Sequence, residues 1–139
     1  MGRILAIDYG KKRTGIAVTD PLKIIANGLT TVATHELFDF LKGYMAKEEV
    51  DTIVIGLPRK VTGEDSETMQ YITPFVNRMK KAYPTLPIKM VDERFTTKIA
   101  FRAMIDGGVK KADRNNKNGT VDMVSATIIL QTYMESNMM

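Results

Sequence analysis

The chain has 139 residues, of which 44% are hydrophobic, and this size and composition suit one globular domain spanning residues 1–139. It contains no cysteine and a single histidine, which excludes disulfides, thiolate nucleophiles and cysteine-based zinc sites. The formal net charge of +4 at pH 7 is a mild bias toward polyanionic partners such as nucleic acid.

Residues 4–10 predict a central strand, because apolar side chains occur on both of its faces. Asp8 interrupts this pattern on the face that would also carry Ile4 and Ala6. A charged carboxylate on an apolar face needs a cation, a ring of donors or an exposed strand end. A second apolar run at residues 16–18 completes a hairpin, whose basic turn carries Lys11, Lys12 and Arg13.

The next elements alternate between strand and helix. Residues 29–32 are rich in β-branched side chains and predict a third antiparallel strand. Residues 35–47 change to helical spacing, with Thr34 as the expected N-cap. Residues 52–56 predict a strongly apolar strand, and the Leu57-Pro58 dipeptide after it indicates that the chain leaves the sheet there.

A second helix is predicted over residues 64–83, where apolar side chains recur at spacings of three and four. Pro74 lies inside this stretch. Either the helix is kinked there, or its regular part begins near Thr73 with Pro74 at the first helical position. The sequence leaves both arrangements open.

The C-terminal part predicts a strand over residues 87–93, a short helix capped by Thr96 or Thr97, a loop over residues 107–119, and a last helix from Thr120 to about Glu135. The order of elements favours an α/β fold, in which helices flank a mixed sheet of three antiparallel strands followed by two crossover-linked strands. Ligands of such sheets bind at the carboxyl ends of the parallel strands.

Three carboxylates fall where that rule places a ligand. Asp8 lies near the end of the first strand, Glu93 ends the last strand, and Asp122 lies in the first turn of the last helix. Such a set of hard oxygen donors suits one or two Mg²⁺ or Mn²⁺ ions, and a pair of ions would hold a phosphodiester and activate water. Asp92 is the alternative ligand if the last strand ends one residue earlier.

Each acid also has a purely structural reading. Asp8 would accept backbone hydrogen bonds in its own turn, Glu93 would form a surface ion pair or cap a helix, and Asp122 would complement a helix dipole. Only the three together favour a metal site. Basic side chains near the acids are candidates to contact backbone phosphates: Lys11, Lys12, Arg13, Arg59, Lys60, Arg94, Lys110, Lys111 and Arg114.

Four motifs occur in order along the chain: Asp8-Tyr9-Gly10-Lys11-Lys12-Arg13-Thr14-Gly15-Ile16-Ala17, Gly56-Leu57-Pro58 with Gly63, Asp92-Glu93-Arg94-Phe95-Thr96-Thr97, and Asp122-Met123-Val124-Ser125-Ala126. Together they closely resemble the motifs of the YqgF family, whose members are Holliday-junction-resolvase-like proteins regarded as nucleases of pre-16S ribosomal RNA. The resemblance covers essentially the whole chain.

The resemblance implies an RNase H-like fold and a divalent-metal nuclease that acts in maturation of the 5′ end of 16S ribosomal RNA. By position, it makes Asp8, Glu93 and Asp122 the catalytic and metal-binding residues, with Mg²⁺ or Mn²⁺ as cofactor. Predicted substrate contacts come from the same motifs: Lys11, Lys12, Arg13, Thr14, Arg59, Arg94, Thr96 and Thr97. Two stretches depart from the family pattern, Arg59-Lys60-Val61-Thr62 and Phe95. These departures concern substrate contacts rather than metal binding.

Three other functions are considered. The first is a nucleic-acid-binding factor on the same fold that does not cut, and the second is a Holliday-junction DNA resolvase. The third is an ATP-binding module of the sugar-kinase and actin type, which normally needs two lobes where this chain has length for one. We expect a cytoplasmic protein without a membrane partner, since no signal or spanning segment is visible. Precursor ribosomal RNA is the expected partner, branched DNA is the alternative, and a homodimer is left open.

Overall fold

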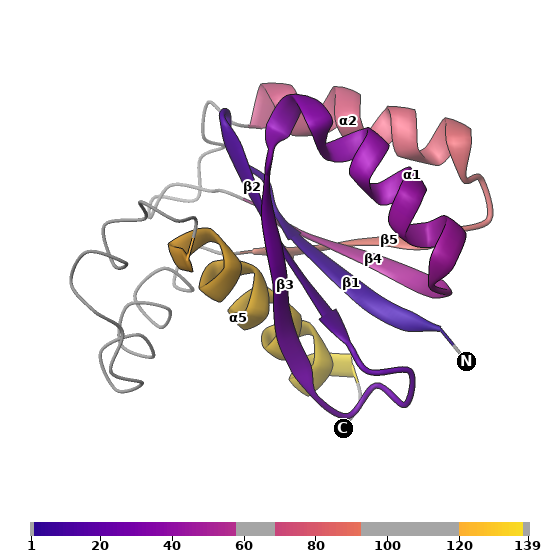
Figure 1. Ribbon diagram of the computed structural model, residues 1–139, viewed down its shortest axis with the longest axis vertical. Helices are drawn as coiled ribbons and strands as arrows, with labels where there is room; N and C mark the ends of the chain where they lie inside the picture. Colours follow the sequence, from indigo (N-terminus) through magenta and orange to yellow (C-terminus); the bar gives the residue numbers. More distant parts are fainter. Residues whose placement is uncertain (1, 58–68, 93–119, 138–139) are drawn as a thin grey trace.

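A central sheet with helices on both faces organises the computed structural model, which describes residues 2–57, 69–92 and 120–137 (Figure 1). Within these residues the sheet has five strands: β1 (Arg3–Asp8), β2 (Arg13–Thr19), β3 (Ala26–Ala33), β4 (Val50–Leu57) and β5 (Ile88–Asp92). The helical segments are η1 (Thr34–Glu36), α1 (Leu37–Lys47), α2 (Met69–Ala82) and α5 (Thr120–Asn137).

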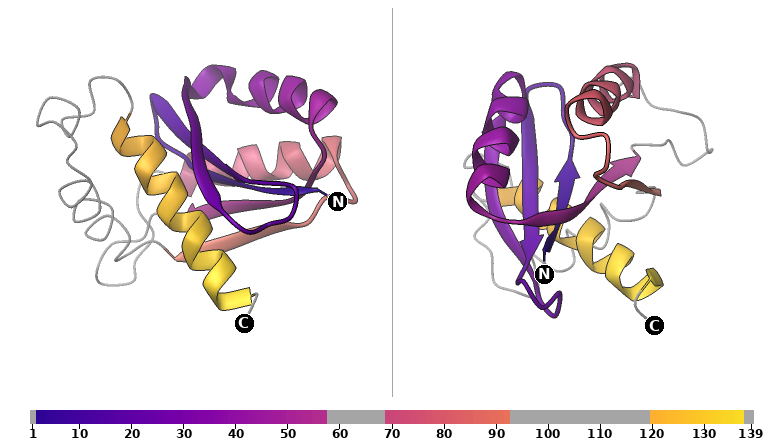
Figure 2. Two further views of the ribbon diagram at one scale, coloured as in Figure 1. Left: turned by 60° about the horizontal axis from the view of Figure 1, so that its bottom comes forward. Right: turned by 90° about the vertical axis from the view of Figure 1, so that its right-hand side faces the viewer.

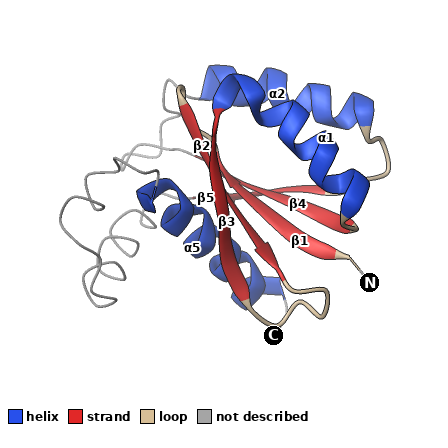
Figure 3. Cartoon of the chain, in the orientation of Figure 1, coloured by secondary structure: helices blue, strands red, loops and turns tan. Residues whose placement is uncertain are grey.

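The strands lie in the order β3-β2-β1-β4-β5, with β1 in the middle (Figure 3). β2 pairs antiparallel with both β1 and β3, whereas β4 pairs parallel with β1 and with β5. This confirms the predicted mixed sheet of three antiparallel strands followed by two crossover-linked strands. The central place of β1 explains why its sequence is apolar on both faces.

Two hydrophobic cores lie on opposite faces of the sheet. α1 and α2 cover one face, and α5 runs across the other, as both views in Figure 2 show. The first core joins α1 and α2 to the sheet through large side chains: Leu5, Ile7, Ile16, Val18, Leu37, Leu41, Ile53, Ile55, Ile72, Phe75 and Met79. The second core, under α5, contains Ile4, Ala6, Ala17, Val54, Ala126, Ile129 and Leu130. Alternation along β1 therefore sends Ile4 and Ala6 toward α5, as the sequence predicts.

The structure corrects one local expectation, the Thr34 cap, and decides between the two arrangements left open at Pro74. Thr34 does not cap α1, because it opens η1 and its hydroxyl donates instead to the carbonyl oxygen of Gly10 at 2.7 Å. α2 does not begin at Pro74, because the helix already includes Met69 and continues past the proline. Burial of Ile72 and Phe75 on either side of Pro74 offsets the lost backbone hydrogen bond.

The turn between β2 and β3 is built around the carboxylate of Asp20. This carboxylate accepts hydrogen bonds from the backbone N–H groups of Ile24 and Ile25, both at 2.8 Å, and from Leu22 at 3.1 Å. The bond from Ile25 is the main reason that the pKa of Asp20 lies below its ordinary value. Among the described helices, none is long and apolar enough to cross a membrane.

The short helix predicted after Thr96 or Thr97 and the loop predicted over residues 107–119 lie outside the described residues. The last helix is confirmed, and it extends to Asn137.

Candidate active site

The parallel strands bring three chain positions to one edge of the sheet. β1 ends at Asp8, β4 at Leu57 and β5 at Asp92, and Leu57 pairs with Asp92 across the ladder. Because β4 separates β1 from β5, those two strand ends lie about 10 Å apart. This is the carboxyl edge, where the sequence predicts a ligand site.

Asp8 is the half-buried last residue of β1. Its place in the alternation puts it on the same face as Ile4 and Ala6, which pack in the core under α5. Asp8 pairs with Gly15 of β2, so the two backbones are neighbours in the antiparallel ladder. The carboxylate therefore lies on the α5 side of the sheet, at its edge.

Asp122 reaches the same place from the first turn of α5. A Cβ atom at Gly15 would collide with the backbone carbonyl group of Asp122 and would lie 2.9 Å from the Cβ of Asp122. Only glycine at this position lets the helix backbone come so close to the sheet. Gly15 thus touches both acids' backbones, and the structure brings Asp8 and Asp122 together across it.

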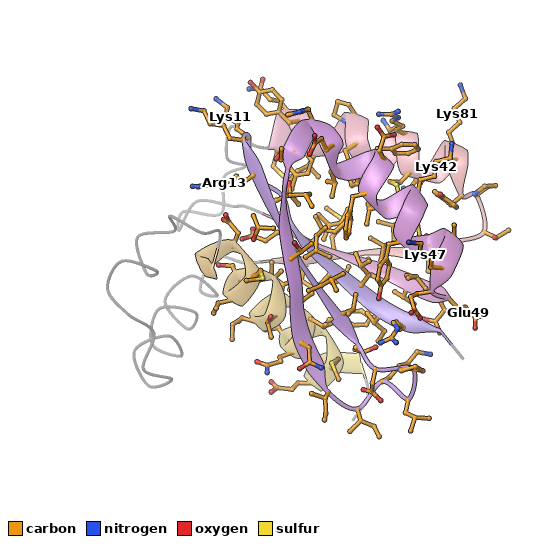
Figure 4. The ribbon with its side chains drawn as sticks, viewed as in Figure 1. Lys11, Arg13, Lys42, Lys47, Glu49 and Lys81 are labelled. Atoms are coloured by element: carbon orange, nitrogen blue, oxygen red, sulfur yellow. The ribbon has the colours of Figure 1, made fainter. Side chains whose placement is uncertain are left out.

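Arg13 forms an ion pair with Asp122, with 3.7 Å between Nε of the arginine and Oδ2 of the aspartate. The Asp122 side chain is 21% exposed and the Arg13 side chain 50% exposed. Figure 4 shows Arg13 at the start of β2, at the end of the molecule where α5 begins. The arginine predicted to contact phosphates therefore also neutralises one of the predicted metal ligands.

A hydroxyl network holds the basic turn in place. Besides its bond to Gly10, Thr34 donates its backbone N–H to the carbonyl oxygen of Lys12 at 3.0 Å. The hydroxyl groups of Thr14 and Thr34 lie 2.9 Å apart and share a hydrogen bond. Thr14 is fully buried, and a contact of its side chain with substrate stays a prediction. Its role is to support the turn.

The chemistry of the two described acids fits a hard divalent cation. Both present carboxylate oxygens, which Mg²⁺ and Mn²⁺ prefer, and the chain has no cysteine to favour a softer metal. His35, the single histidine, lies in η1 with its side chain 82% exposed. Within residues 2–57, 69–92 and 120–137, no three acids or histidines gather closely enough to hold a metal ion.

Several predicted site residues lie outside the described residues. These are Glu93, Arg59, Arg94, Thr96 and Thr97, together with the further basic candidates Lys60, Lys110, Lys111 and Arg114. Asp92 belongs to β5 by its backbone. The third ligand therefore stays a prediction.

The sequence reasoning missed the part that Gly15 plays. The sequence does carry a signal for this role, because an isolated glycine inside a strand pattern often marks a close backbone approach. Gly28 of β3 differs, because a Cβ atom added there would make only ordinary contacts with two atoms of α5, Thr127 Oγ1 at 3.4 Å and Met123 Cβ at 3.5 Å. The close approach of α5 to the sheet is therefore at Gly15.

Solved structures with a similar fold are Holliday-junction resolvases. RuvC of Thermus thermophilus, in complex with a Holliday junction substrate, aligns with 99% of this chain and 97% of its own, with a TM-score of 0.59 and 15% identity. The fowlpox virus Holliday junction resolvase aligns with 96% of this chain and 98% of its own, with a TM-score of 0.54 and 15% identity. The fold is therefore of the RNase H-like class.

The sequence is similar to a narrower group within that class. Residues 2–136 match the model of the RuvX family, described as Holliday junction resolvase. A protein of Bacteroides thetaiotaomicron named "Putative pre-16S rRNA nuclease" is 61% identical over 136 residues, covering 98% of each chain. One of the same name from Phocaeicola vulgatus is 60% identical, covering 98% of this chain and 97% of its own. This chain belongs to the RuvX family.

Proposed function

We propose that the chain is a divalent-metal-dependent nuclease that hydrolyses phosphodiester bonds in precursor 16S ribosomal RNA, at the 5′ end. The observation that carries the proposal is the meeting of Asp8 and Asp122 at Gly15, on the carboxyl edge of the sheet and beside the basic turn. The names of the family and of its relatives support the reaction class.

Asp8, Asp122 and Glu93 are the proposed metal ligands. Val91 of β5 packs in the core under α5, on the face of the sheet that carries Asp8. Glu93 is proposed as the third ligand because of its place in the third motif, with Asp92 as the alternative.

When bound, Mg²⁺ or Mn²⁺ supplies Lewis-acid stabilisation of the phosphodiester and lowers the pKa of attacking water. The chain's own residues do the remaining work. The two acids meeting at Gly15 present their oxygens from two different elements, and the ion pair from Arg13 orients the carboxylate of Asp122. The network around Thr34 positions Lys11 and its neighbours to contact phosphates on either side of the reacting bond.

Further phosphate contacts are proposed from Lys12 of the first motif, from Arg59 directly after Pro58, and from three residues of the third motif: Arg94, Thr96 and Thr97. The expected compartment is the cytoplasm, because the proposed substrate is precursor ribosomal RNA. A homodimer would suit a branched DNA substrate with two equivalent strands, and its test is the mass of the protein in solution.

The decisive experiment uses Asp8→Asn. Wild-type protein is incubated with 5′-extended precursor 16S RNA and with a four-way DNA junction, each with Mg²⁺, with Mn²⁺ and with a chelator. Loss of a residue that merely supports a metal ligand costs about 10- to 100-fold in activity, so loss of the ligand Asp8 should cost more. RNA binding should stay or strengthen, because the variant removes a negative charge near phosphates.

Asp39→Asn is the matched control, since it makes the same chemical change at an exposed acid on α1. It should cut as the wild type does. Cutting by Asp8→Asn at the wild-type rate would overturn the proposal. Binding by the wild type without cutting under any ion would indicate a non-catalytic factor, and preference for the junction would indicate a DNA resolvase. Activity should also fall in acid, where protonated carboxylates release metal.

A further inference from the structure

A groove lies on the face of the sheet that α1 and α2 cover, at the same edge as Asp8 and Asp122. It lies between the start of α1 and the first half of α2 and has a volume of about 380 Å³. We call it the aromatic groove and define it by Tyr9, Phe38, Tyr71, Phe75 and Arg78. Tyr9 directly follows Asp8 in the chain and packs against the core under α1 and α2. The groove and the acids therefore lie on opposite faces of the same edge of the sheet.

Aromatic rings form most of this surface. The rings of Tyr9 and Phe75 are 5.6 Å apart at their centroids and tilted by 41°. Phe75 is only 8% exposed and forms the floor, whereas Tyr71 is 42% exposed at the rim. The groove therefore offers flat, uncharged faces to a ligand.

Two cations lie against these rings. Nζ of Lys11 is 5.5 Å from the ring centroid of Tyr71, and Cζ of Arg78 is 3.8 Å from that of Phe38. Contact with Phe38 holds the Arg78 guanidinium beside the groove, and the arginine is exposed. The rim also carries His35, which lies 3.9 Å from the carboxylate of Glu36. Positive charge beside aromatic faces complements a ligand that is both planar and anionic.

We propose that the aromatic groove binds an unpaired nucleotide of the RNA substrate. Its base stacks against Tyr71 and Arg78, and its phosphate meets Lys11. The inference rests on the proposed function, because it assumes that a nucleic-acid strand already lies at the edge of Asp8. Lys11 links the two places, since it belongs to the basic turn and also contacts Tyr71.

The geometry favours an unpaired nucleotide over a duplex. Bases inside a duplex are stacked on one another, so their faces are covered, whereas unpaired bases stack on aromatic side chains and on arginine planes. The groove thus makes the chain prefer a strand whose nucleotides near the cut are single-stranded.

The test uses the absence of tryptophan from the chain, which makes Tyr71→Trp a single-tryptophan reporter. With a chelator present to prevent cutting, a 12-nucleotide single-stranded RNA should quench its fluorescence. Inorganic polyphosphate, which has the charge but no bases, should not, and neither should a blunt RNA duplex. Tyr83→Trp is the matched control, because it lies just beyond α2, roughly 18 Å farther along the helix axis, and should show no quenching.

Three further variants separate stacking from charge. Tyr71→Ala should weaken binding of the single strand by about 5-fold or more, the lower end of the effect of one stacked base. Lys11→Gln should reduce the slope of log Kobs against log salt concentration by about 0.7, because Lys11 meets the phosphate. Arg78→Lys should leave that slope unchanged and still weaken binding, because lysine keeps the charge but lacks the planar face.

Equal quenching by polyphosphate, or bound RNA without quenching, would overturn the groove as a nucleotide site. Stronger quenching by a peptide or protein than by RNA would do the same. These outcomes are distinct from failure of the proposed function. If Asp8→Asn still cuts while RNA quenches Tyr71→Trp, the results support the groove as a nucleotide site and contradict the metal site. If Asp8→Asn does not cut and RNA does not quench Tyr71→Trp, the results support the nuclease and contradict the groove.

Discussion

The two faces of the sheet are packed differently. Under α5 the core mixes the small residues Ala6, Ala17 and Ala126 with larger side chains, and Gly15 lets the helix backbone approach the strands. Under α1 and α2 the contacts are made by large side chains, such as Leu41 and Ile55, that keep the layers apart. Close approach positions the acids on the first face, whereas buried volume supplies stability on the second. Substitutions should therefore separate the geometry of the site from the stability of the fold.

Leu41→Ala should give the largest loss of stability. Leu41 is fully buried on the α1 side, and such a truncation costs about 2–5 kcal/mol in the free energy of unfolding. Urea unfolding measures this change. Cutting of precursor RNA, assayed where the variant is still folded, should be unaffected, and its loss in a folded variant would mean that the two faces are coupled.

Gly15→Ala should act on the opposite face, with about 1–3 kcal/mol lost from the free energy of unfolding because the new methyl group meets the backbone of Asp122. Cutting should be lost even where the variant is folded, since α5 must move away from Asp8. Thermal shift with and without Mn²⁺ provides a readout of ion binding that does not depend on RNA.

Gly43→Ala is its matched control. Gly43 lies in α1 with no atom within 4 Å of an added Cβ, so alanine should stabilise the helix by about 0.5–1 kcal/mol and leave cutting intact. Full activity in Gly15→Ala would contradict the close-approach explanation of the site.

Thr34→Val should have a smaller effect that reaches both faces. The substitution removes the hydroxyl bonds to Gly10 and Thr14, at a cost of about 1 kcal/mol in unfolding free energy. Because these bonds hold the basic turn, RNA binding should weaken more than metal binding. Gel-shift titration and thermal shift with Mn²⁺ compare the two; equal losses would point to a general loss of structure.

Asp20→Asn should have the smallest effect and should leave the site untouched. Hydrogen bonds from the backbone, chiefly that of Ile25, keep the pKa of Asp20 low in the folded state. Its stabilisation is therefore present above the unfolded-state pKa, near pH 4, and is lost as pH falls through the lower folded value. Urea unfolding from pH 6 to pH 2 should show a shallower acid dependence in the variant. An unchanged acid dependence would mean that Asp20 does not contribute to the loss of stability at low pH.

Periodicity predicted the elements well where packing follows the local pattern. Alternation in β1 predicted that Asp8 shares a face with Ile4 and Ala6, and the structure shows that this face meets the core under α5. Helical spacing over residues 64–83 predicted a helix, and its buried side chains Ile72, Phe75 and Met79 are three and four residues apart. The Thr34 cap was wrong because a distant acceptor, the carbonyl oxygen of Gly10, competes with the helix backbone for the same hydroxyl.

The sequence by itself determined the order of the described elements and the mixed pairing of the sheet, and it predicted the acids, because these follow from patterns within short segments of chain. Only the tertiary structure decided that α5 approaches the sheet closely at Gly15, and that Arg13 pairs with Asp122. It alone also brought Tyr71 and Arg78 beside the residue that follows Asp8. Contacts between distant segments depend on the packing of whole layers, which no local period encodes.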